Sequence, residues 1–219
     1  MVNTFFLSLV ASAAAAAACA LPSLNVPACP RTGTVRYNKS VPDKQEFPLT
    51  QVDLCYTDTS IQITFTAYNE TNFYFNASQG TNDAIWQYEV MEAFIAQVTD
   101  DPQTYLEFEV NPNNVTFQAL IYNPSKVRAT PLGTYFIPEP LPLTAVTVLD
   151  KPGKKWTSSA SIPLGLFNVE KAKGTDWRMN FFRTVVSPDT FPDQLLGAWS
   201  PPDQASFHMT PFFGRVRFV

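Results

Sequence analysis

The sequence predicts an all-β protein, a single antiparallel β-sandwich of the jelly-roll or immunoglobulin-like type. The 219-residue chain contains 19 prolines and 18 phenylalanines but only 16% charged residues, which is typical of a turn-rich β protein with an aromatic core. Short apolar runs recur roughly every ten to fifteen residues, with turn signals between them. No long segment has the period of a helix, and no internal repeat is evident.

Residues 1–20 are expected to be a signal peptide. Residues 5–18 are apolar or small and carry no charge, and Ala18-Cys19-Ala20 ends the run as an A-x-A cleavage site. The run is too short and too rich in alanine to span a membrane, and Pro22 follows it. We therefore expect a secreted, extracellular protein.

Residues 21–44 are expected to be a proline-rich N-terminal segment, irregular over residues 21–34. The mature chain keeps two cysteines, Cys29 and Cys55. In an oxidising compartment two cysteines most simply form one disulfide. This bond would close a loop of about 27 residues, which contributes about 3 kcal/mol to stability. It would tie the N-terminal segment to a later strand.

Residues 45–219 are expected to form the sandwich. In residues 60–68, Ile61, Ile63 and Phe65 alternate with polar side chains, as in a half-buried strand. One helical turn is expected at residues 163–167. The proline-rich residues 124–152 are expected to cross the sandwich as a long excursion and not to form a second domain. The candidate strands are residues 60–68, 88–98, 105–110, 116–122, 156–162, 178–186 and 214–219.

Two of these strands are expected to present a polar face. Because side chains alternate along a strand, Leu106, Phe108 and Val110 should point to the core, and Glu107 and Glu109 away from it. The same alternation applies to the second strand, residues 178–186. Met179 and Phe181 should point inward, whereas Arg178, Asn180 and Phe182 should point outward.

These polar side chains are suited to a hydroxyl-rich ligand. Carboxylates, amides and guanidinium groups form paired hydrogen bonds with such ligands. The candidate contacts are Glu107, Glu109, Asn180, Arg178 and Arg183. The alternative is cross-strand ion pairing on a solvated sheet.

Five blocks of sequence, in their order and spacing over residues 45–219, resemble the family 9 carbohydrate-binding modules. The resemblance is greatest to DOMON-like, stand-alone secreted members from fungi. It implies a β-sandwich that binds a polysaccharide or oligosaccharide without catalysis. The blocks are DAIWQYEVMEAFI (83–95), YLEFEVNP (105–112), WRMNFFR (177–183), AWSP (198–201) and FHMTPFFGRVRF (207–218).

The resemblance also implies where the sugar would lie. The family holds a sugar between two exposed aromatic rings, and Trp86 matches the first of them. The second ring should lie shortly before the last strand, where this chain departs from the family pattern, so Trp199, Phe207 and His208 are all candidates. In a phenylalanine-rich sandwich most tryptophans simply pack in the core or at strand ends, as we expect of Trp177.

A structural calcium ion is a further implication of the resemblance. Calcium requires several oxygen ligands. Asp83 and Asp101 are candidate contributors, although the chain has no D-x-D-x-D loop. No other cofactor is expected.

The remaining sequence features concern partners. Four sequons, at Asn38, Asn69, Asn76 and Asn114, are expected to carry N-glycans and to mark solvent-facing turns. The net charge is −4 and no basic run exists, which argues against nucleic acid or an anionic membrane as a partner. We expect a monomer.

Three alternatives to sugar binding stay open. Glu107 and Glu109 would stand about 7 Å apart on one strand face, a spacing that glycoside hydrolysis permits. A cyclase or isomerase of a small apolar molecule would need only an aromatic pocket and no motif. The third alternative is a secreted structural or interaction protein that has lost sugar binding. A Ser-His-Asp triad is not indicated, because His208 is the only histidine and no G-x-S-x-G motif is present.

Overall fold

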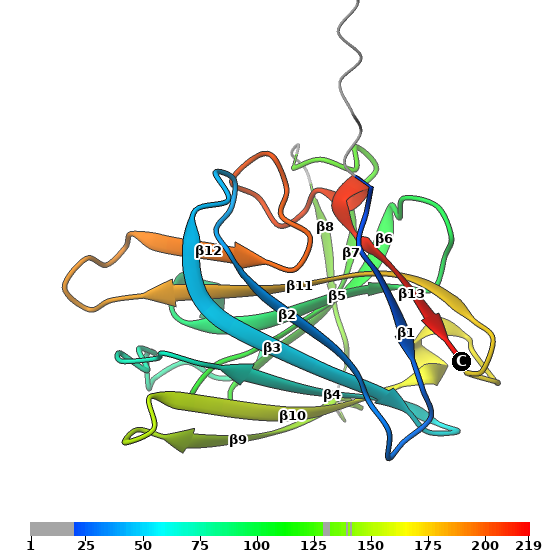
Figure 1. The fold of residues 1–219 in the computed structure, drawn as a ribbon, viewed down its shortest axis with the longest axis horizontal. Coiled ribbons are helices and arrows are strands. Elements are labelled where there is room, and N and C mark those ends of the chain that lie inside the picture. Colours follow the sequence, from blue (N-terminus) through cyan, green and yellow to red (C-terminus); the bar gives the residue numbers. More distant parts are fainter. Residues whose placement is uncertain (1–19, 129–131, 139, 141) are drawn as a thin grey trace, which may run out of the picture.

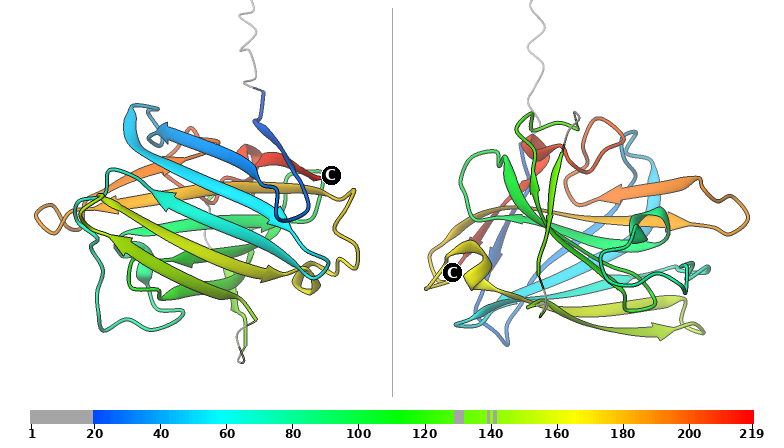
Figure 2. Two further views of the ribbon diagram at one scale, coloured as in Figure 1. Left: turned by 60° about the horizontal axis from the view of Figure 1, so that its bottom comes forward. Right: turned by 180° about the vertical axis from the view of Figure 1, so that it is seen from behind.

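The computed structural model describes residues 20–128, 132–138, 140 and 142–219. The expected signal peptide therefore lies, apart from Ala20, outside the described residues. In the described part of the chain, thirteen strands form two facing sheets (Figures 1 and 2). This arrangement confirms the predicted all-β sandwich. None of the described helices is long and apolar enough to cross a bilayer.

The larger sheet has eight strands and carries most of the sequence blocks described above. Every pairing in it is antiparallel except that of the first and last strands, which run parallel. One short strand pairs with the second half of β11, while β13 pairs with its first half. In spatial order the strands are β1 (Ser23–Val26), β13 (Gly214–Phe218), β11 (Asp176–Val186), β5 (Val90–Ala96), β6 (Thr104–Val110), β7 (Thr116–Tyr122) and β8 (Gly133–Phe136), with β12 (Gln194–Ala198) beside β11.

The smaller sheet has five antiparallel strands. Three short 3-10 turns lie outside the sheets: η1 (Ile85–Gln87), η2 (Leu164–Phe167) and η3 (Thr210–Phe212). The turn expected at residues 163–167 is therefore confirmed. In spatial order the strands of this sheet are β2 (Gly33–Lys39), β3 (Glu46–Tyr56), β4 (Ser60–Ala67), β10 (Lys155–Pro163) and β9 (Thr144–Asp150).

The main core lies between the two sheets. Phe65 of β4 and Trp156 of β10 pack there with Phe108 of β6 and Phe181 of β11. The alternation expected in residues 105–110 is confirmed, because Leu106, Phe108 and Val110 all belong to this core. Met179 and Phe181 also point inward, as expected.

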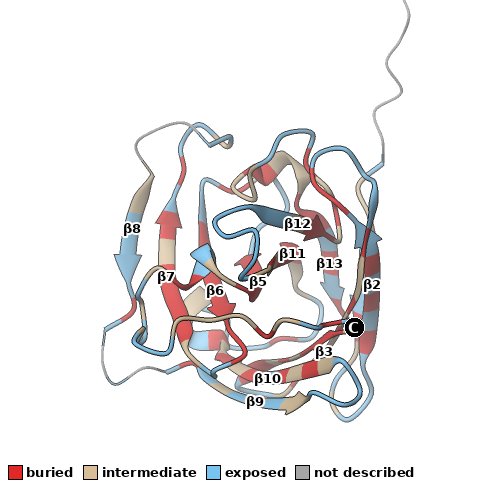
Figure 3. Cartoon of the chain, turned by 90° about the vertical axis from the view of Figure 1, so that its left-hand side faces the viewer, coloured by how far each residue is buried: buried red, intermediate tan, exposed pale blue. Residues whose placement is uncertain are grey.

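A second apolar cluster covers the opposite face of the larger sheet. Phe94, Tyr105 and Phe182 pack there beneath Ile85 of η1 and Phe213, which precedes β13. As a result β5 and most of β6 and β11 are buried on both faces, whereas β8 and β9 are largely exposed (Figure 3). The outward face, on which the sequence predicts polar side chains, is therefore covered in large part by loops and not simply solvated.

The structure contains strands in two proline-rich segments, and the expectation that residues 21–34 are irregular was wrong. Residues 23–26 form β1, which pairs with β13, and β2 begins at Gly33, so the segment 21–34 is not irregular. Residues 124–152 include β8 of the larger sheet and β9 of the smaller sheet. In both cases strands distant in sequence satisfy the backbone hydrogen bonds, and their pairing does not depend on a local apolar period.

The predicted disulfide is present. Cys29 follows β1, Cys55 lies on β3, and their Cα atoms are 5.1 Å apart. The bond ties the N-terminal segment to the smaller sheet.

Candidate functional site

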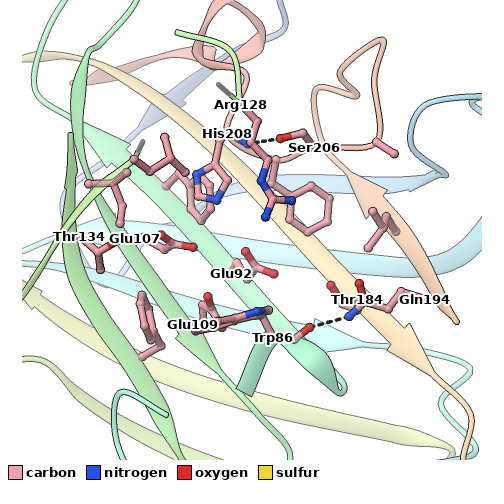
Figure 4. Close-up of a pocket in the computed structure, with 17 residues that line it drawn as sticks. Trp86, Glu92, Glu107, Glu109, Arg128, Thr134, Thr184, Gln194, Ser206 and His208 are labelled. Carbon is pink, nitrogen blue, oxygen red and sulfur yellow. Dashed lines mark hydrogen bonds between the residues drawn. The ribbon is translucent and has the colours of Figure 1, made fainter. Parts of the chain in front are cut away.

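A pocket of about 310 Å³ opens on the outer face of the larger sheet. Its floor is formed by β5, β6 and β7, and its walls by η1, β12, the loop of residues 205–208, and Arg128, Leu132 and Thr134 (Figure 4). The pocket lies among the side chains of the second apolar cluster, and polar side chains form part of its lining. The lining residues are Trp86, Glu92, Phe94, Glu107, Glu109, Phe117, Ile121, Arg128, Leu132, Thr134, Thr184, Gln194, Leu196, Ala205, Ser206, Phe207 and His208.

Three glutamates converge on the floor of this pocket. Glu92 of β5 stands directly opposite Glu109 of β6, and Glu107 lies two residues away on the same face of β6. One carboxylate oxygen from each lies within 4.8 Å of the other two. All three side chains are buried, at 3%, 1% and 7% exposure for Glu92, Glu109 and Glu107 respectively. Figure 4 shows their carboxylates pointing into the pocket.

Burial makes it costly to ionise these carboxyl groups. It raises the pKa of Glu92 and of Glu109 well above the usual range, and the negative charges of the neighbouring glutamates raise both further. Burial also raises the pKa of Glu107 to about 7, although the positive charge of Arg128 opposes the rise. The floor can therefore hold protons, or accept hydrogen bonds from a ligand, near neutral pH.

Trp86 forms one wall of the pocket. It lies in the short η1 turn, and 43% of its surface is exposed. Its ring meets Phe117 edge to face, with centroids 5.2 Å apart, and its backbone oxygen accepts a hydrogen bond of 2.6 Å from the Gln194 side chain. An exposed indole fixed in this way can stack against an apolar face of a ligand.

Phe207 and His208 form the opposite wall. The Phe207 ring stacks on Phe182, with centroids 4.2 Å apart. Nδ1 of His208 lies 2.7 Å from the hydroxyl of Tyr105, within hydrogen-bond distance. Burial, with a smaller effect from the positive charge of Arg128, lowers the pKa of His208 to about 4, so the ring is neutral at ordinary pH.

One relative is similar to this chain over nearly its whole length. A protein of Arthroderma benhamiae named "Extracellular protein" is 51% identical over 217 residues, which cover 96% of this chain and 98% of that protein. This chain belongs to the same family. Its expected extracellular location is thereby confirmed. No family model matches the sequence.

Solved structures show the same fold. A candidate carbohydrate-binding protein from Bacteroides uniformis superposes with a TM-score of 0.70 at 17% identity, covering 91% of this chain and 100% of that one. A family 9 carbohydrate-binding module from Caldicellulosiruptor kristjanssonii, in complex with cellotriose, gives 0.60 at 14% identity over 90% and 93%. The same module with glucose gives 0.61 at 14% identity over 90% and 95%.

In this chain, five of the sequence-predicted sugar contacts lie around one pocket. They come from η1, from β6 and from the loop before β13, which are distant in sequence. These residues are Trp86, Glu107, Glu109, Phe207 and His208. Whether they bind sugar stays a prediction.

Two predicted contacts are structural instead. Arg178 is 3% exposed and donates hydrogen bonds to the carbonyl oxygens of Phe213 and Pro211 and to the Asp101 carboxylate. Asn180 is fully buried, and its side-chain amide exchanges hydrogen bonds with the backbone of Ser200. Both point to the outer face as expected, but they anchor the loops that cover it, so they are not available to a ligand.

Arg183 and Trp199 also lie outside the pocket. Arg183 shares the inward parity of Phe181 and is fully buried, where its guanidinium pairs with Glu70 at 2.7 Å and Glu89 at 3.4 Å. The half-buried ring of Trp199 packs beside Phe181 and over Gly214, where any Cβ would clash with it. Neither residue can serve as a sugar contact in this arrangement.

The proposed calcium ligands do not form a site. Asp83 is exposed and accepts a hydrogen bond of 2.7 Å from the Gly80 amide, which closes its own turn. Asp101 pairs with Arg178 at 2.8 Å. Neither belongs to a group of three convergent acidic, histidine or cysteine side chains among the described residues. The residues present therefore do not support a calcium ion at these two positions.

The four sequon asparagines leave the pocket open. Asn38, Asn69 and Asn114 are exposed and Asn76 is half-buried. None of them lines the pocket. Glycans at these positions stay a prediction.

Sequence reasoning missed Glu92, Phe117 and Arg128. Glu92 interrupts an otherwise apolar run, and an acidic residue within a fully buried strand was a usable signal. Phe117 and Arg128 carried no such signal, because their place at the pocket depends on how β7 and the following loop lie against the floor.

Proposed function

We propose that the protein is a secreted carbohydrate-binding protein of the family 9 type, which binds glycan in the pocket on the outer face of the larger sheet. Binding is non-covalent and involves no catalysis. The observation that carries this proposal is the exposed ring of Trp86 beside a floor of carboxyl groups that point into the pocket. An aromatic face combined with a few convergent polar groups is typical of small-ligand pockets.

The chemistry of a sugar fits this pocket. The apolar C–H face of a pyranose would stack on Trp86, and Phe207 would limit the pocket on the other side. The hydroxyl groups would then donate to the carboxylate oxygens of Glu107 and Glu109. Both oxygens of Glu109 are buried without a hydrogen-bond partner among the described residues, so a donor from the ligand would relieve a desolvation penalty.

The location and the structural neighbours support one class of ligand. The protein is extracellular, and a module of the same fold is known in complex with cellotriose and with glucose. We therefore propose plant or fungal cell-wall glycans as the ligand. A cavity of about 310 Å³ is at the lower end of ordinary ligand pockets, so it would enclose only a small part of a chain.

Calorimetric titration with cello-, xylo- and chito-oligosaccharides tests this proposal. We expect Trp86→Ala to weaken binding about tenfold or more, because stacking and burial on an indole contribute more than about 1.4 kcal/mol. Tyr135→Ala is the matched control, since Tyr135 is an aromatic residue of β8, 63% exposed and outside the pocket. Equal affinity of the two variants would contradict the assigned site.

The same samples test the hydrolase alternative. Glu107 has a raised pKa of about 7 and lies near a second carboxyl group, as a general acid in a glycosidase would. Non-catalytic binding predicts oligosaccharides of unchanged length after prolonged incubation. If shortened oligosaccharides form with the unaltered protein but not with Glu107→Gln, the function is hydrolysis and not binding alone.

A further inference from the structure

The carboxyl groups on the pocket floor have no basic side chain in contact with them. No salt bridge joins Glu92, Glu107 or Glu109 to another residue in the described part of the chain. Glu109 is 1% exposed and points into the pocket, and neither of its carboxylate oxygens has a hydrogen-bond partner among the described residues (Figure 4). A buried carboxyl group without a partner is costly, so its orientation into a cavity points to a ligand that donates hydrogen bonds.

The basic residues nearby do not supply the missing charge. Arg178, on the adjacent β11, is held by Asp101 and by two carbonyl oxygens. Arg183 points to the other face of the sheet, where it forms its own ion pairs. Burial keeps the pKa of His208 at about 4, so that ring is neutral. Arg128 is exposed at the wall of the pocket and forms no salt bridge among the described residues, so a ligand could bring the positive charge.

The size and walls of the pocket favour an organic ligand over a bare ion. A cavity of about 310 Å³ can hold a small organic group. The exposed ring of Trp86 lies on one side of it and Phe207 on the other. Aromatic faces attract ammonium groups and also pack against apolar surfaces. A ligand with an apolar face and a positively charged group would therefore match both the walls and the floor.

We infer that the glycan bound in this pocket carries free amino groups, as an oligomer of 2-amino-2-deoxyglucose does, and that the three floor glutamates receive one of its ammonium groups. The inference rests on the proposed function and names the class of glycan. An ammonium group has three N–H donors and no acceptor, whereas an ionised carboxylate only accepts. One carboxylate oxygen from each of Glu92, Glu107 and Glu109 lies within 4.8 Å of the other two. A single ammonium group with hydrogen bonds of about 2.7–2.9 Å can therefore reach all three.

Neutral sugars would satisfy the floor less well. A hydroxyl group donates one hydrogen bond and brings no charge, and acetylation of the amine removes the positive charge. Hydrogen bonds between charged groups are about twice as strong as those between neutral groups. The pairing of β5 with β6 also places Glu92 directly opposite Glu109, where like charges destabilise the sheet unless a cation lies between them. The pocket should therefore discriminate between an amino sugar and its neutral analogues.

Calorimetric titration of the full-length secreted protein with three oligosaccharides of equal length and linkage tests this inference. Oligomers of glucose, of 2-amino-2-deoxyglucose and of its N-acetylated form differ only in the group on carbon 2. Near neutral pH and at physiological salt, we expect the amino oligomer to bind at least about tenfold more tightly than the glucose oligomer, and the acetylated oligomer to show no such gain. Glu109→Gln, which keeps the side-chain size, should bring the ratio of the amino to the glucose affinity close to one.

Two further variants separate the charge of the pocket from the net negative charge of the protein. Asp83→Asn removes an exposed carboxylate outside the pocket and should leave the affinity ratio unchanged. Arg128→Gln removes a positive charge from the wall and should raise the ratio, because a like charge no longer opposes the ammonium group. Should Glu109→Gln fail to fold, Glu92→Gln gives the same test from the opposite strand.

The possible results distinguish this inference from the proposed function. Equal affinity for the amino and glucose oligomers would overturn the inference and leave glycan binding intact. A preference for the amino oligomer that survives Glu109→Gln, or that Asp83→Asn abolishes, would also overturn it. Absence of binding to all three oligomers would contradict both proposals. A lysine-rich peptide that binds more tightly than the amino oligomer would exclude the glycan as the preferred occupant.

Discussion

Trp86 and His208 face the same pocket, but their surroundings differ. The Trp86 ring is almost half exposed and is positioned by edge contact with Phe117, which leaves its face open. His208 is held against Phe94 and the hydroxyl of Tyr105. Its neutral ring therefore serves mainly to shape the wall, and its ionisation would disturb that packing.

This leads to a prediction for His208→Gln. The pKa of His208 is lowered to about 4 in the folded protein, against 6.5 ordinarily. As the pH falls from about 6.5 to 4, the unfolded chain takes up a proton that the folded chain does not, so stability is lost through this window. We expect Tm to fall less steeply over this range in His208→Gln than in the unaltered protein.

Thermal unfolding at a series of pH values checks this. The carboxyl groups on the pocket floor and Arg128 are present in both proteins, so the readout is the difference between the two curves. Parallel curves from pH 7 to pH 4 would contradict the account of His208.

The central strands show how alternation predicts orientation and where it was misapplied. The period of two correctly placed Glu107 and Glu109 on the face opposite Phe108. The same rule assigns Arg183 to the inward face with Phe181, and its selection as a sugar contact ignored that parity. The rule gives a side of the sheet only, so it did not reveal that loops would cover the outer side.

A second prediction concerns β11 and its buried arginine. Arg183 neutralises Glu70, to which it donates at 2.7 Å, and also donates to the Tyr68 carbonyl oxygen. Removal of one partner leaves a buried charge uncompensated, so we expect Arg183→Met to lower the free energy of unfolding by about 3–5 kcal/mol.

Urea unfolding of three proteins checks it: the unaltered chain, Arg183→Met and the double variant Arg183→Met/Glu70→Gln. The second change removes the uncompensated charge and should restore part of the loss. An Arg183→Met variant as stable as the unaltered protein would refute the role of this ion pair.

In the molecule as a whole, the strands could be predicted better than their partners. Strong local alternation identified β4, β6, β7 and β13 nearly to the residue. The parallel pairing of β1 with β13 could not be read from the sequence, because it joins the two ends of the described chain. The pocket depends on such long-range pairings, since the register of β5 on β6 places Glu92 opposite Glu109.

The loops that complete the pocket are equally non-local. Trp86 and Phe207 are distant in sequence, and they line the same pocket because η1 and the segment before β13 cover the same sheet face. The resemblance to family 9 modules indicated Trp86, but the sequence could not choose among the candidates for the facing wall. The fold brings Phe207 and His208 to the pocket and leaves Trp199 in the packing beside Phe181.

The most direct test of the glycan site is an experimental structure of the protein with the oligosaccharide that binds it most tightly. The account predicts a sugar ring stacked on Trp86, with hydroxyl groups within hydrogen-bond distance of Glu107 or Glu109. A sugar found elsewhere, for example on the outer face of the five-stranded sheet, with this pocket empty, would contradict it.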